Sequence, residues 1–69
     1  MDPKAKLELG RLSEAKLDEP WSSRPAQKQV LSNVLHGRDV TRAQRQRIAT
    51  LMEGRPLRDL AQVVAEVLP

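Results

Sequence analysis

The chain has 69 residues and no cysteine, and its 12 basic and 9 acidic side chains give it a net charge of +3. A chain of this length buries only about 60% of the surface that its unfolded form exposes, so it has room for one small core. The lack of cysteine excludes disulfides and thiolate zinc sites, and no apolar run approaches the roughly 18 residues of a membrane span. We therefore expect residues 1–69 to form one soluble, cytoplasmic domain that is monomeric when free and makes no membrane contact.

Positive charge is concentrated in the middle of the chain. Residues 1–37 carry six basic and five acidic groups, whereas residues 38–58 carry six arginines and two acidic groups, a net charge of +4. Arginine keeps its charge at ordinary pH, and its planar, forked donors suit phosphate or carboxylate partners. The middle segment therefore predicts a binding surface. The alternative is a solvated helix face that serves only solubility.

The first predicted helix covers residues 3–17. It begins with an aspartate that can act as N-cap and a proline whose missing N–H is not needed at the first helical position. Gly10 weakens this helix by about 1 kcal/mol relative to alanine, so an alternative is that residues 1–20 are flexible in the free protein and helical only when docked. The outer face carries a row of mixed charge formed by Lys4, Glu8 and Arg11. We expect these residues to form ion pairs along the helix. The alternative is a basic binding element beside the N-terminus.

Residues 18–25 predict a loop, because each of its two prolines disfavours helical conformation in the preceding residue. Trp21 in this loop is the only aromatic residue of the chain. In a protein so poor in large side chains, we expect the indole to fill the core where the loop crosses it. The alternative is an anchor for a protein partner, because tryptophan is enriched among binding hot spots. One tryptophan is too little for single-strand recognition, which stacks several bases on several aromatic rings.

Residues 25–36 predict the second helix, with Pro25 in its first turn and Gly37 just after its end. His36, the only histidine, is expected at the helix C-terminus, where a partly cationic imidazole stabilises the exposed carbonyls. No cysteine or second histidine exists to complete a metal site. A broad apolar face makes this a core helix: Ala26, Val30, Leu31, Val34 and Leu35.

Residues 42–53 predict a basic helix, and Thr41 with Gln44 predicts the capping box that starts it. Apolar side chains at helical spacing form an inner face that must be buried: Ile48, Leu51 and Met52. The arginines of this region lie outside that face. They are the candidates for binding nucleic acid or an acidic partner, together with the two arginines that follow the helix: Arg38, Arg42, Arg45, Arg47, Arg55 and Arg58.

The last predicted helix covers residues 56–68, and Gly54 and Pro56 predict a tight Gly-x-Pro turn before it. Its apolar residues recur at helical spacing, whereas Asp59 and Glu66 on its outer face repel phosphate. Strand periodicity and hairpin turns are missing from the sequence. We therefore expect an all-α fold, a small bundle of three to four short helices.

The sequence assembles no catalytic arrangement. General acid–base pairs, activated nucleophiles, glycine-rich phosphate loops and metal-ligand spacings each need groups that this chain does not combine. A helical bundle of this size also offers little concavity for a substrate. We therefore expect a protein that is not an enzyme and holds no metal or cofactor.

The last two predicted helices are superficially similar to a DNA-binding helix-turn-helix. In that motif the second helix enters the major groove, but here the second helix is the less basic one. Only Arg55, Arg58 and Gln62 could face bases, so the arginines of residues 42–53 would instead contact phosphates. DNA binding therefore stays one alternative. A protein-interaction module that binds an acidic partner is another.

The chain resembles the small phage-encoded regulators that bind host RNA polymerase and block promoter initiation or promote antitermination. The likeness lies in residues 1–20 as an attachable N-terminal segment and in TRAQRQR, residues 41–47, as a basic helix. The resemblance implies docking near the nucleic-acid exit or the initiation-factor surface, with Lys4, Lys6 and Arg11 the first residues to test for contacts with the protein partner. We therefore expect a transcription regulator that docks on polymerase with its arginines near the DNA or RNA path.

Overall fold

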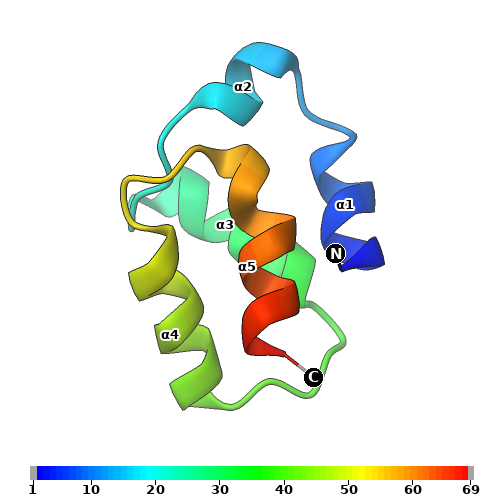
Figure 1. The fold of residues 1–69 in the computed structure, drawn as a ribbon, viewed down its shortest axis with the longest axis vertical. Coiled ribbons are helices and arrows are strands. Elements are labelled where there is room, and N and C mark those ends of the chain that lie inside the picture. Colours follow the sequence, from blue (N-terminus) through cyan, green and yellow to red (C-terminus); the bar gives the residue numbers. More distant parts are fainter. Residues whose placement is uncertain (1, 69) are drawn as a thin grey trace.

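Helices form nearly all the regular structure of this protein. The computed structural model describes residues 2–68, which contain five α-helices, one 3-10 helix and no β-strand. In chain order the elements are α1 (Pro3–Leu9), α2 (Glu14–Asp18), α3 (Pro25–Leu35), α4 (Arg42–Met52), the 3-10 helix η1 (Leu57–Asp59) and α5 (Leu60–Val67) (Figure 1). The predicted all-α class is confirmed, whereas the predicted number of three to four helices is too low.

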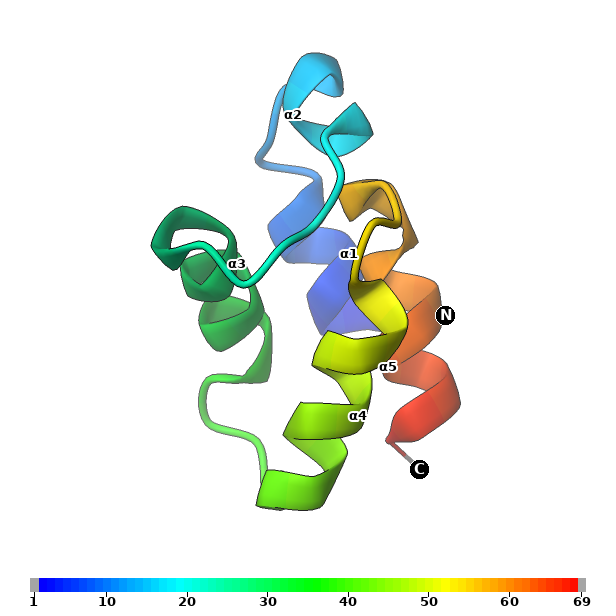
Figure 2. The same ribbon diagram turned by 90° about the vertical axis from the view of Figure 1, so that its left-hand side faces the viewer.

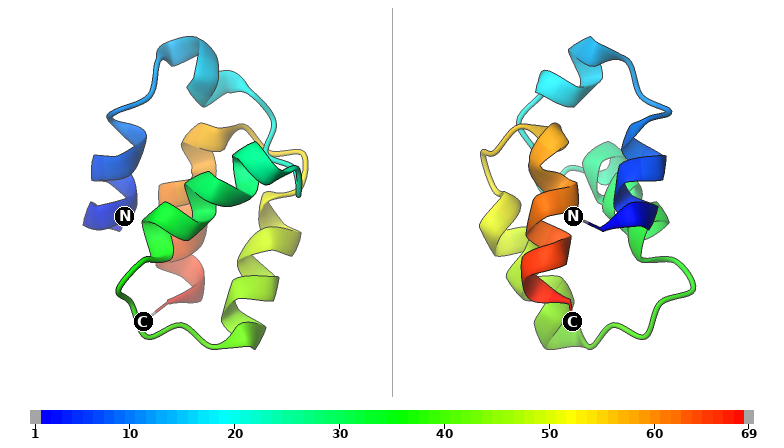
Figure 3. Two further views of the ribbon diagram at one scale, coloured as in Figure 1. Left: turned by 180° about the vertical axis from the view of Figure 1, so that it is seen from behind. Right: turned by 45° about the vertical axis from the view of Figure 1, so that its right-hand side comes forward.

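The central element is α5, which lies between α1 and α4 and contacts both (Figure 1). Seen from behind, α3 crosses in front of α5, and it also contacts α1 (Figure 3). In Figure 2, α3 and α4 face the viewer and α1 lies behind them. Because neighbours cover α5 on several sides, half of its residues are buried: Leu60, Ala61, Val63 and Val64.

The predicted helix of residues 3–17 is divided in two. The Asp2 carboxylate caps α1 by accepting a hydrogen bond at 2.9 Å from an amide of the first turn. After Leu9 the chain leaves the helix, and Gly10 occupies the C-cap position. Ser13 then caps α2, its hydroxyl accepting from an amide three residues later at 3.2 Å. A second N-cap residue thus overrides the apolar periodicity that predicted one continuous helix.

The helices α3 and α4 begin where the sequence predicts and end one residue earlier. The predicted capping box of α4 is complete. The Thr41 hydroxyl accepts from the Gln44 amide at 3.1 Å, and the Gln44 side chain accepts from the Thr41 amide at 2.9 Å. On the predicted inner face, Ile48 and Met52 are fully buried and Leu51 is half-buried.

The connection from α4 to α5 is longer than a tight Gly-x-Pro turn. Gly54 follows α4 with a φ of +80°, and Pro56 caps η1, so that α5 begins only at Leu60. The backbone of this connection pairs with the loop before α3. The Trp21 amide donates to the Arg55 carbonyl at 2.8 Å, and the Gly54 amide donates to the Trp21 carbonyl at 3.0 Å. These bonds hold the loop against the start of η1.

Trp21 fills the core, as its preferred interpretation predicts. Its side chain is 1% exposed, and the indole N–H donates to the Gln27 carbonyl at 3.2 Å. The alternative, an anchor for a protein partner, has little support because only 1% of the side chain is exposed. The other large, fully buried side chains come from α3, α4, η1 and α5: Val34, Ile48, Met52, Leu57, Leu60, Val63 and Val64.

Candidate anion-binding site

The structure divides the six arginines predicted to bind an anion into two groups. The members of the first group form ion pairs within the chain: Arg38 with Asp2, Arg55 with Asp59, and Arg58 with both Asp18 and Glu14. Hydrogen bonds to the two carboxylates raise the pKa of the Arg58 guanidinium. Because a carboxylate already compensates each of these charges, the first group offers little to an anionic partner.

The pair between Arg38 and Asp2 stabilises the fold. Arg38 donates two hydrogen bonds to the Asp2 carboxylate, one of them with an Nη1–Oδ1 distance of 3.0 Å, and only 8% of the Asp2 side chain is exposed. These hydrogen bonds lower the pKa of Asp2, and the amide of Ala5 at the start of α1 lowers it further. The pair joins the α3–α4 connection to the N-terminus of α1.

Replacing Asp2 by asparagine should lower the stability of the protein by about 1.5 kcal/mol at pH 7, because the cap acceptor remains but the charged hydrogen bonds are lost. The folded-state pKa of Asp2 lies below its ordinary value of 3.8. The stabilisation is therefore complete well above that value and disappears as the pH falls through the lowered pKa. Thermal melts should show a constant difference between wild type and Asp2→Asn from pH 7 to about 5, which shrinks at more acidic pH. A difference that persists unchanged in acid would contradict this role.

Three basic residues near the N-terminus are predicted to bind a protein partner, and their surroundings differ from one another. The Lys4 ammonium donates to the carbonyl of His36, the C-cap of α3, and thereby satisfies that helix end. Arg11 forms the predicted helix ion pair with Glu8 at 3.3 Å, which Lys4 does not join. Lys6 is exposed and forms no ion pair with another residue of the described chain.

The second group of arginines lies on α4. Arg42, Arg45 and Arg47, here called the α4 arginines, are exposed, and none forms an ion pair within residues 2–68. At about 100° per residue, Arg42 and Arg45 project from neighbouring parts of the helix surface, whereas Arg47 points roughly 160° away from Arg45. The α4 arginines therefore flank the helix on two sides and do not form one tight cluster.

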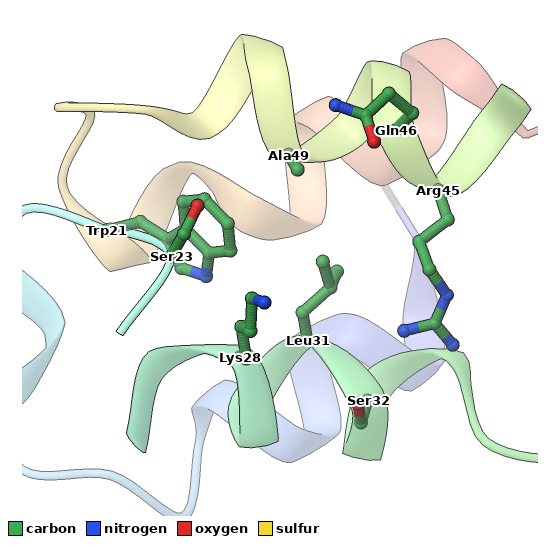
Figure 4. Close-up of a pocket in the computed structure, with 8 residues that line it drawn as sticks. All are labelled: Trp21, Ser23, Lys28, Leu31, Ser32, Arg45, Gln46 and Ala49. Atoms are coloured by element: carbon green, nitrogen blue, oxygen red, sulfur yellow. The ribbon is translucent and has the colours of Figure 1, made fainter. Parts of the chain in front are cut away.

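A groove of about 420 Å³ separates α3 from α4 (Figure 4). Lys28 rises from α3, and Arg45 extends from α4 toward α3, so two cationic side chains from different helices approach the same space (Figure 4). Lys28, like Arg45, has no ion-pair partner among residues 2–68. The remaining lining residues are Trp21, Ser23, Leu31, Ser32, Gln46 and Ala49.

The lining of the groove suits an oxyanion. Lys28 and Arg45 supply charged donors and Ser23 and Ser32 supply hydroxyl donors, the kinds of group that bind phosphate or carboxylate oxygens. No acidic side chain lines this groove within the described chain. Sequence reasoning missed Lys28 because its helix has the pattern of a core helix, and only the tertiary arrangement brings it to the same groove as Arg45.

No protein-family model, curated protein or solved structure matches the chain. Among residues 2–68, no group of three or more histidine, cysteine, aspartate or glutamate residues could hold a metal ion. No helix in the same part of the chain is long and apolar enough to cross a membrane. The candidate site therefore rests on the geometry and charge described above.

Proposed function

We propose that this protein is a non-enzymatic transcription regulator that docks on RNA polymerase and holds α4 against the negatively charged DNA or RNA path. The observation that carries the proposal is the separation of its cations. Four of the five arginines outside α4 form ion pairs with carboxylates of the chain, Arg24 being the exception, whereas the α4 arginines and Lys28 form no ion pair within residues 2–68. These four cations remain available to an external anion.

Nucleic-acid phosphates are the proposed anion. Guanidinium and ammonium groups bind phosphate oxygens without reading the base sequence, so they position a protein on a backbone. Four cations are fewer than the roughly 6–10 phosphate contacts of strongly salt-dependent DNA-binding proteins. This small number supports a regulator that gains most of its affinity from a protein contact and only part of it from nucleic acid.

The helix-turn-helix alternative gains less support from the geometry. The helix in the recognition position would be α5, whose residues mostly contribute to the core. Its fully exposed side chains are Gln62 and Glu66, which hydrogen-bond to each other at 3.2 Å. A helix that displays one amide and one carboxylate has few donors for base edges. The α4 arginines are thus better placed to contact phosphates than α5 is to read bases.

Binding to RNA polymerase from the organism that expresses the chain tests the proposal. The purified protein is titrated with polymerase alone, with polymerase assembled on a DNA–RNA scaffold (loaded polymerase), and with the scaffold alone. We expect binding to polymerase, an affinity about 100-fold higher for loaded polymerase, and weak binding to the scaffold alone. Equal affinity for both polymerase forms would favour an acidic protein partner, and tight binding to the scaffold alone would favour an autonomous DNA-binding protein. No binding to polymerase would overturn the proposal.

A further inference from the structure

Leu7 is the only exposed large apolar side chain among residues 2–68. It is 64% exposed, although the protein has a small core and few large apolar residues. Burying a leucine side chain is worth about 1.5–3 kcal/mol, so a partner that covers Leu7 gains appreciable free energy. We infer that the outer face of α1 docks on a partner protein through a segment that combines apolar side chains with carboxylates.

The shape of this face suits a packed helix. A shallow hollow of about 470 Å³ is formed by Pro3, Lys6, Leu7, Gly10 and Arg11, here called the α1 face. Its first four residues follow the i, i+3, i+4, i+7 spacing of a helix contact stripe. Proline and glycine at the two ends of the stripe leave little side chain above the backbone, so a partner helix can come close to Leu7.

The charge of the α1 face defines the chemistry of the partner. Lys6 has no ion-pair partner within residues 2–68, and Arg11, 68% exposed, has one neighbouring carboxylate in Glu8. Carboxylates beside the apolar residues of the partner would complement both cations. A second copy of the chain fits poorly, because a two-fold contact through Leu7 would bring the same cations of both copies together.

The position of the α1 face lets it act together with the α3–α4 groove. α1 and α4 lie on opposite sides of α5 (Figure 1), so a protein on α1 leaves α4 accessible. The inference rests on the proposed function and deepens it, because it assigns the protein contact to the α1 face and the nucleic-acid contact to α4. The two contacts should therefore respond to different substitutions.

Replacing Leu7 by glutamate should weaken binding to RNA polymerase without scaffold about 30-fold, because an apolar contact is lost and a like charge faces the partner carboxylates. Glutamate is a good helix former and Leu7 is exposed, so circular dichroism melts should match wild type. Leu7→Met is the matched control and should bind within about threefold of wild type. Replacing the α4 arginines by glutamine should leave this scaffold-free affinity unchanged.

The possible outcomes distinguish an error in the docking face from an error in the proposed function. If wild type binds polymerase and Leu7→Glu binds equally well, the docking face is wrong while the proposed function stands. If wild type does not bind polymerase, both fail. Sedimentation of the free protein supplies a further check: a wild-type dimer that Leu7→Glu converts to monomer would show that a second copy covers the face, and would overturn the inference.

Discussion

Replacing Arg42, Arg45 and Arg47 together by glutamine should lower the affinity for loaded polymerase about 100-fold. Each exposed guanidinium that meets a phosphate contributes about 1 kcal/mol, so three together account for roughly two orders of magnitude. The fold should survive, because the α4 arginines are exposed and form no ion pair within residues 2–68, and glutamine is a good helix former. Titration of loaded polymerase and thermal circular dichroism measure the two effects.

A control with the same charge change distinguishes position from net charge. Lys16, Arg55 and Arg58 each pair with a carboxylate of the chain. Replacing these three by glutamine removes the same three charges from another part of the surface, and should change the affinity for loaded polymerase by less than about threefold. An equal loss of affinity in both triple variants would mean that binding depends only on the net charge of the protein. Loss of helicity on replacing the α4 arginines would instead mean that they are structural.

Replacing Trp21 by alanine should remove a large part of the free energy of unfolding of the protein. Removal of a buried tryptophan side chain costs about 3–5 kcal/mol, and a domain of this length has a total stability of only about 3–10 kcal/mol. The indole is also hydrogen-bonded to the Gln27 carbonyl, which the variant leaves without that donor. Thermal circular dichroism should show no unfolding transition or one at a much lower temperature.

The conservative variant Trp21→Phe separates packing from binding. It keeps most of the ring volume and should fold with a stability lowered by about 1–2 kcal/mol, since the indole N–H and part of the ring are lost. The side chain at position 21 is buried and gives the α3–α4 groove no charge, so the variant should bind polymerase with the affinity of wild type. A folded Trp21→Phe protein that no longer binds polymerase would restore the partner-anchor interpretation.

Features with local causes are the part of the fold that the sequence predicts well. The capping box of α4 depends on Thr41 and Gln44, three residues apart, and is present as predicted. The starts of α3 and α4 likewise follow from proline and cap preferences. The division between α1 and α2 was missed although its signal is also local. Ser13 is a good N-cap, but the apolar periodicity of residues 3–17 favours one continuous helix.

Contacts between distant parts of the chain account for most of what the sequence did not reveal. Arg38 is 36 residues from Asp2, and Arg58 is 40 residues from Asp18, so their neutralisation depends on the tertiary fold. The same holds for Lys28, which lines the same groove as Arg45 only because α3 and α4 lie on its two sides. Six arginines that look equivalent in sequence thus become three paired and three available residues.

The salt dependence of binding to loaded polymerase tests the central claim that the α4 arginines contact phosphates. Plots of the logarithm of affinity against that of salt concentration fall by about 0.9 per phosphate contact on duplex DNA and about 0.7 on a single strand. The variant lacks all three α4 arginines. The slope for wild type should therefore be steeper by about 2–3 than the slope for this variant. Equal slopes for the two proteins would contradict the account.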